Sequence, residues 1–120
     1  MKFSYKKLAM GVLASVMLAG AASAGELLVY SSTDADNLKY YMDNFQKDNP
    51  DIKVKVVRES TGTMAAKMMA EKDNPQADVL FEMAATVALN METQGMFHPY
   101  TPKGMDKIDQ RYVDKEGEVN

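Results

Sequence analysis

Short apolar runs and amphipathic stretches alternate along most of the chain, in an order that occurs three times. The apolar or alternating runs have the length and the polar flanks of strands, at residues 26–30, 52–56 and 77–81. Each run precedes a stretch in which apolar residues have helical spacing, at residues 34–47, 64–72 and 84–94. Three strand–helix units in succession predict an α/β fold, with a parallel sheet flanked by helices and joined by right-handed connections.

The ends of these helices have sequence signals of their own. Thr33 with Asp36 three residues later resembles a capping box with Asp in place of Glu. Residues 60–63 are expected to be a turn before the second helix, and Gly95 is well placed to end the third helix in a left-handed conformation. Residues 96–120 are less regular, and we expect no further long helix there.

The first 24 residues have the pattern of a signal peptide. Three lysines precede an uncharged run over residues 8–22, and Ala22 and Ala24 supply the small side chains that signal peptidase requires. The uncharged run is too short for a membrane-spanning helix, which takes about 20 residues. We therefore expect residues 1–24 to be cleaved and residues 25–120 to be exported.

Composition narrows the class of protein further. Removing the three lysines of the leader takes the formal net charge from −3 to about −6, so the mature chain is not expected to bind nucleic acid. The sequence has no cysteine, which excludes a disulfide framework and a lipid anchor at the cleavage site. An exported chain without an anchor is best retained in a periplasm. No oligomerisation signal is visible, so we expect a monomer.

Candidate binding groups follow the strands. Parallel strands end at one edge of a sheet, and open α/β sheets bind ligands in the crevice at that edge. The unpaired N–H groups of the following helices favour an anion there. Nearby hydroxyls belong to Ser31, Ser32, Thr33, Ser60, Thr61 and Thr63. They predict a pocket for a phosphate, phosphonate or carboxylate, and the alternative is that they only cap helices.

An enzyme is not expected. His98 is the sole histidine and follows the third helix, so it is not placed as a general base, and no nucleophile or nucleotide-binding motif is present. Three acids, Asp34, Glu59 and Glu82, follow strands and leave an exported metal-dependent hydrolase as an alternative. We assign no catalytic residue, no metal and no cofactor.

Several segments together resemble a known family. ELLVYSSTD, IKVKVV, STGT and NPQADVLFEMAATVALNMETQGMFHPY, in this order after a signal peptide, resemble the type 2 periplasmic binding proteins. They are most similar to the family 1 extracellular solute-binding proteins, which include ferric-ion, phosphonate and sugar-phosphate binders. The resemblance implies a two-lobed protein that closes on its ligand and docks on the permease of an ABC importer. It also implies that residues 25–120 are most of the first lobe, with the second lobe absent.

The resemblance further bears on the ligand. In the ferric branch a histidine follows the first strand and a glutamate follows the third, and the matching positions here are Asp34 and Met83. Methionine is not a hard oxygen donor for ferric ion, so the organic-anion branch is favoured and iron is the alternative. In that branch, hydroxyls and amides at the strand ends bind the ligand. The expected ligand-binding residues are Ser31, Ser32, Thr33, Ser60, Thr61, Gly62, Thr63 and Glu82.

Overall fold

Strands and helices alternate in the order that the sequence predicts. The computed structural model describes residues 25–114, so the predicted signal peptide lies outside the described residues. Within that range the elements are β1 (Gly25–Ser31), α1 (Ala35–Asp48), β2 (Ile52–Arg58), α2 (Thr61–Ala70), β3 (Val79–Phe81) and α3 (Ala85–Glu92). Two short 3-10 helices follow, η1 (Met105–Lys107) and η2 (Gln110–Tyr112).

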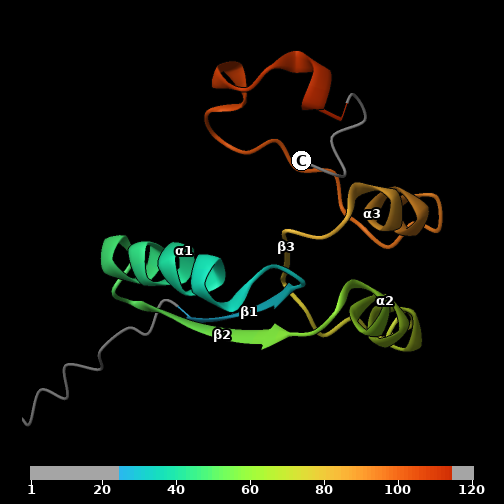
Figure 1. The fold of residues 1–120 in the computed structure, drawn as a ribbon, viewed down its shortest axis with the longest axis horizontal. Helices are drawn as coiled ribbons and strands as arrows, with labels where there is room; N and C mark the ends of the chain where they lie inside the picture. The colour runs from blue at the N-terminus through green and yellow to red at the C-terminus, as the bar shows by residue number, and fades with distance from the viewer. Residues whose placement is uncertain (1–24, 115–120) are drawn as a thin grey trace, which may run out of the picture.

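The three strands form one parallel sheet in the order β2-β1-β3 (Figure 1). The last residue of β1, Ser31, is level with Arg58 at the end of β2 and with Phe81 at the end of β3. All three strands therefore end at the same height, and the loops that follow them meet at one edge of the sheet. The predicted parallel α/β architecture is confirmed.

Helices α1 and α2 cover opposite faces of the sheet. Successive side chains of a strand point to opposite faces, and Phe81, level with Ser31, packs its ring 5.5 Å from that of Tyr41 in α1. The neighbouring residue of β1, Tyr30, instead bonds to Glu71 directly after α2. Among residues 25–114 no helix is long and apolar enough to cross a membrane. The buried apolar core consists of Val29, Tyr30, Leu38, Met64, Ala88 and Met91.

Two expected helix starts differ from the structure. Helix α2 begins at Thr61 with Ser60 as its N-cap, so residues 61–63 are its first turn and not a separate loop. The expected capping box of Thr33 and Asp36 is wrong, because Asp34 occupies the N-cap position of α1 and its side chain makes no capping bond. A one-residue shift is enough to undo a capping box, since its two partners must stand three residues apart.

Strand β3 is shorter than expected because of Asp78. Its backbone N–H donates to the carbonyl of Leu28 at 2.9 Å, and its carboxylate accepts the Leu28 N–H at 2.8 Å. A side chain thus takes the place of the next backbone bond of the ladder. The pairing of β1 with β3 is confined to three residues, and they lie next to the carboxyl edge.

Gly95 has the left-handed conformation that the sequence predicts, although α3 itself ends at Glu92, two residues before the expected end. Gly95 has φ 67°, its N–H donates to the Glu92 carbonyl at 2.8 Å, and the Met96 N–H donates to the Met91 carbonyl at 3.3 Å. Both bonds belong to a Schellman motif, in which a glycine relieves the steric cost of the left-handed conformation. The motif turns the chain away from α3 at the residue that the sequence indicates.

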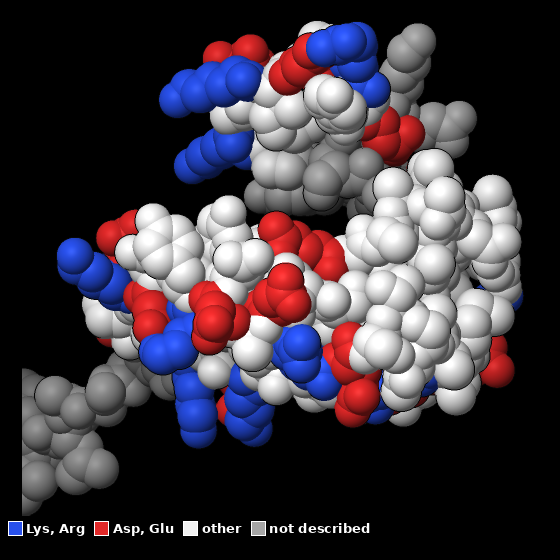
Figure 2. Space-filling view, viewed as in Figure 1, with Lys and Arg blue, Asp and Glu red and all other residues white. Residues whose placement is uncertain are grey.

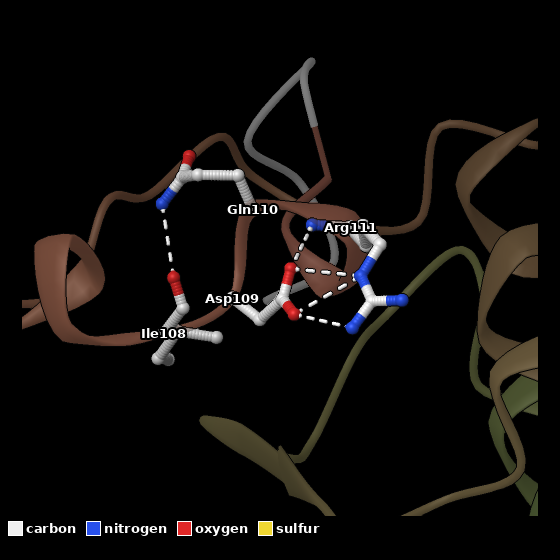
Figure 3. A network of polar contacts seen from close by, with 4 residues as sticks. All are labelled: Ile108, Asp109, Gln110 and Arg111. Atoms are coloured by element: carbon white, nitrogen blue, oxygen red, sulfur yellow. Dashed lines mark hydrogen bonds and ion pairs between the residues drawn. The ribbon is translucent and has the colours of Figure 1, made fainter.

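Residues 96–114 are held mainly by local bonds. Arg111 and Asp109 form an exposed ion pair with Nη2–Oδ2 at 2.6 Å, while the Gln110 amide donates to the Ile108 carbonyl at 3.1 Å (Figure 3). The guanidinium lowers the pKa of Asp109, and the carboxylate raises the pKa of Arg111. An exposed pair between near neighbours contributes little to stability.

Candidate ligand-binding site

Ser32 joins the three loops at the carboxyl edge. Its hydroxyl donates to the Glu82 carbonyl at 3.1 Å, and its backbone N–H donates to the same oxygen at 3.3 Å. The Thr61 hydroxyl donates to the Ser32 hydroxyl at 3.2 Å. These partners are 29 and 50 residues away in the sequence. The structure therefore brings together one predicted site residue from each loop.

Ser31 and Thr33 have structural partners next to Ser32. The side chain of Ser31 is fully buried, and its hydroxyl accepts the Thr33 N–H at 3.2 Å. A buried hydroxyl bonded in this way stabilises the turn into α1. Thr33 is half-buried, and its carbonyl accepts a bond from Arg58.

The second loop is the capped start of α2. The Ser60 hydroxyl accepts the Thr63 N–H at 3.2 Å and lies 2.9 Å from the Thr63 hydroxyl. For Ser60 the capping role considered from the sequence is therefore correct. Gly62 is exposed in the first turn, and a Cβ at this position would meet no atom within 4 Å. The fold does not require a glycine at this position. Because Gly62 has no side chain, a ligand could approach the backbone of α2 closely.

Glu82 contributes its backbone to the cluster and leaves its side chain exposed. It has φ 50°, a region that costs energy for a residue with a Cβ. Its carbonyl accepts both bonds from Ser32. These two hydrogen bonds, from the loop that follows β1, help to hold the unfavourable backbone conformation of Glu82 after β3.

The acids at this edge do not form a metal site. Asp34, Glu59 and Glu82 are exposed, and within residues 25–114 no group of three His, Cys, Asp or Glu residues lies close enough to hold a metal ion. The hydrolase alternative required these carboxylates to converge. Within residues 25–114 these carboxylates therefore do not form the metal centre that the hydrolase alternative requires.

Arg58 is a residue of this edge that the sequence analysis did not single out. Its Nε donates to the Thr33 carbonyl at 2.7 Å, so the end of β2 is tied to the start of α1. At the sequence level it is the last polar residue of an alternating strand, which is typical of a solvent-facing position. The signal that could have identified it is its place, level with Ser31, at the end of the strand.

A second polar cluster fixes α2 against the sheet. The buried Tyr30 hydroxyl donates to Glu71 at 3.1 Å, and Lys67 lies 2.5 Å from the same carboxylate and 5.2 Å from the centre of the Tyr30 ring. The hydrogen bond from Lys67 lowers the pKa of Glu71, and the bond to Glu71 raises the pKa of Lys67. Since α2 carries Thr61 at its other end, this cluster positions the second loop.

A described cavity lies beside the edge and not over it. A cavity of about 730 Å³ is bordered by α2, β3, α3 and residues 95–102. Of the predicted site residues only Glu82 lines it, together with Met83 and His98. In Figure 2 the surface over α2 and α3 is largely uncharged, whereas charges of both signs cover α1 and β2. The cavity is thus a mainly apolar neighbour of the polar cluster.

The family of this chain follows from its match to a family model. The model of the bacterial extracellular solute-binding proteins matches residues 31–119, which is most of the chain and includes both hydroxyl-rich loops. This chain belongs to that family. The proteins of this family are binding proteins and not enzymes, in agreement with the expectation from the sequence.

Two curated relatives extend beyond this chain. A probable ABC transporter periplasmic-binding protein, y4fP of Sinorhizobium fredii, is 29% identical over 109 residues, which are 89% of this chain and 30% of that protein. An uncharacterized protein of Haemophilus influenzae is 32% identical over 127 aligned positions, covering 93% of this chain and 33% of the relative. The chain therefore spans about a third of the length of these two relatives.

Solved structures show the same fold. The periplasmic binding protein AfuA of Actinobacillus pleuropneumoniae, with fructose-6-phosphate bound, is 28% identical with a TM-score of 0.69, over 74% of this chain and 28% of AfuA. The periplasmic binding protein P5PA is 25% identical with a TM-score of 0.67, over 73% of this chain and 28% of P5PA. Iron-bound HitA of Pseudomonas aeruginosa has a TM-score of 0.69 at 20% identity, over 77% of this chain and 30% of HitA. At that identity HitA supports the fold alone.

Proposed function

We propose that the whole protein is the periplasmic substrate-binding component of an ABC importer and that it captures a small organic anion carrying a phosphate or phosphonate group. The observation that carries the proposal is the meeting of Ser32, Thr61 and the Glu82 backbone at the carboxyl edge of the sheet. Open α/β sheets bind their ligands at this edge. Residues 25–120 supply one lobe, and a permease in the inner membrane receives the ligand.

Unpaired donors at the start of α1 support an anionic ligand. The first backbone bond of this helix runs from the Leu38 N–H to the Asp34 carbonyl, so the three preceding N–H groups have no partner within the helix. Among the described residues no side chain caps this end. Free N–H groups and the helix dipole favour a negatively charged group, and the Ser32 and Thr61 hydroxyls add neutral donors nearby.

The relatives favour the same class of solute. AfuA, whose similarity covers most of this chain, has a sugar phosphate bound. The relative y4fP is described as a probable periplasmic-binding protein of an ABC transporter. Ferric ion is the less favoured alternative. The position expected to hold a hard ligand after β3 is Met83, and residues 25–114 contain no three-residue metal cluster.

A thermal-shift screen of the full two-lobed protein tests this function. The panel holds phosphonates, sugar phosphates, dicarboxylates and ferric citrate. A ligand that binds only the folded protein adds about 2.7 kcal/mol of stability at a hundredfold excess over its Kd. We expect a shift with a phosphate or phosphonate compound. A shift with ferric citrate alone would contradict the organic-anion proposal.

Substitutions at the edge then locate the site. Ser32→Ala and Thr61→Ala should each weaken binding of the active compound by about 1 kcal/mol or more, the effect of one buried hydrogen bond. Thr93→Ala is the matched control, because it removes the same hydroxyl at the far end of α3, where Thr93 bonds only locally. Unchanged affinity in both test variants, measured by calorimetry, would remove these loops from the site.

A further inference from the structure

The carboxyl edge contains one positively charged side chain. Segments 31–34, 58–63 and 82–85, which follow the three strands or end them, include the acids Asp34, Glu59 and Glu82 but only one Lys or Arg, Arg58. Three exposed carboxylates repel an anion at short range, and helix N–H groups carry only partial charges. An anion that binds at this edge therefore depends strongly on the guanidinium.

The bonding of Arg58 leaves its charge available. Only Nε is engaged, with the Thr33 carbonyl at 2.7 Å. Within residues 25–114 neither Nη atom has a hydrogen-bond partner, and neither Asp34 nor Glu59 forms an ion pair with Arg58. Four other cations of the described residues are paired with a carboxylate: Lys39, Lys55, Lys67 and Arg111. Within the part of the chain that the structure describes, Arg58 therefore holds a carbonyl with Nε and has no partner for its two outer nitrogens.

We propose that Arg58 is the specificity-determining residue of the site and that its outer nitrogens bind the anionic group of the ligand. The bond from Nε to Thr33 fixes the guanidinium beside the loop that carries Ser32. A guanidinium held in one orientation can bind a phosphate or phosphonate through two parallel bonds. The same charge disfavours a metal cation at this edge. The inference rests on the proposed function and names the residue that selects the anion.

The test compares two variants of the full two-lobed protein that lose the same charge from the same strand. Arg58→Gln removes the guanidinium at the edge. Lys53→Gln removes an exposed charge five residues earlier in β2. This position is roughly 16 Å away along the strand. At that distance salt largely screens the interaction between exposed charges. Affinity for fructose 6-phosphate and for methylphosphonate is measured by calorimetry at pH 7.5 and at pH 5.

The expected result depends on the charge of the ligand. At pH 7.5 a phosphate ester is mainly a dianion, and Arg58→Gln should weaken binding about tenfold to a hundredfold, as for hydrogen bonds to a charged group. At pH 5, below a second pKa of about 6, the monoanion has half the charge, and the loss should shrink to about threefold to tenfold. The affinity of Lys53→Gln should be within about twofold of the wild-type affinity at both pH values. Because this variant loses the same charge, it also shows how much the titration of other groups changes the affinity.

Each other result is decisive. A loss in Arg58→Gln that is equal at both pH values would show that Arg58 only positions the Thr33 loop, and would overturn the inference. Unchanged affinity in Arg58→Gln would overturn it as well, with the proposed function intact. If the wild-type protein binds neither compound nor any phosphate or phosphonate of the screening panel, both the proposed function and the role of Arg58 fail.

Discussion

The segments that lead into α1 and α2 have similar sequences, SSTD at residues 31–34 and ESTGT at residues 59–63, but their hydroxyl groups have different partners. In the second loop Ser60 caps its own helix by accepting the Thr63 N–H. In the first loop the side chain of the N-cap residue, Asp34, makes no capping bond, and the Ser32 hydroxyl joins Thr61 to Glu82. A run of serines and threonines before a helix therefore does not by itself indicate a cap or a ligand site. The partner of each hydroxyl decides between them.

The two loops also differ in how they are anchored. Ser31, directly before the first loop, is fully buried in the sheet, so the backbone of that loop continues from the core. The second loop begins at the exposed residues Glu59 and Ser60. Its position depends on α2, which is attached through Met64 and through the Tyr30–Glu71 contact. We infer that the second loop is the more easily displaced part of the site.

Met64→Ala should have the largest effect, because Met64 is completely buried and is the buried residue of α2. Removing a buried methionine side chain should lower the free energy of unfolding by about 2–5 kcal/mol. The matched control is Met69→Ala in the same helix, where the side chain is 40% exposed. Its loss in free energy of unfolding should be well below half of the loss for Met64→Ala. Urea unfolding measures both, and equal losses would contradict the anchoring role of Met64.

The capping difference predicts a smaller effect. Ser60→Ala should lower the free energy of unfolding by about 1 kcal/mol, the typical value of an N-cap. Asp34→Ala should lower the free energy of unfolding by much less when both are measured in about 0.5 M salt. The Asp34 side chain makes no capping bond, and salt screens its interaction with the helix dipole. Urea unfolding of the two variants in the same buffer compares the helix starts directly. A larger loss for Asp34→Ala would show that α1 is capped in solution.

The sequence predicts the sheet well because each strand–helix unit carries its own local signal. Gly95 is left-handed as expected, since the left-handed position is specified within five residues of sequence. The start of α2 was placed three residues late, because Gly62 between threonines has the composition of a turn. In the structure Ser60 caps the helix, and the same residues become its first turn.

The partners within the site could not be predicted in the same way. Contacts of Ser32 with Thr61 and Glu82, and of Arg58 with Thr33, join residues 25 to 50 positions apart. They depend on the register that places the three strand ends at one height. Hydropathy and spacing predict that the loops meet, but they do not determine which atoms bond. For that reason the sequence identified Ser32 and Thr61 as candidates and missed Arg58.

The smallest effect concerns the pH dependence of the contact that holds α2. The hydrogen bond from Lys67 lowers the folded-state pKa of Glu71 below its ordinary value of 4.5, so this carboxylate stabilises the protein above about pH 4.5 and loses that contribution as the pH falls through the folded-state pKa. Lys67 stays charged throughout, because its pKa is raised. Between pH 6 and pH 3 the wild type should therefore lose more thermal stability than Glu71→Gln.

The control Glu59→Gln makes the same chemical change at an exposed residue of the second loop and should follow the wild type. Parallel melting curves for Glu71→Gln and the wild type would mean that the Tyr30–Glu71–Lys67 contact does not hold α2, and with it the second loop, in place.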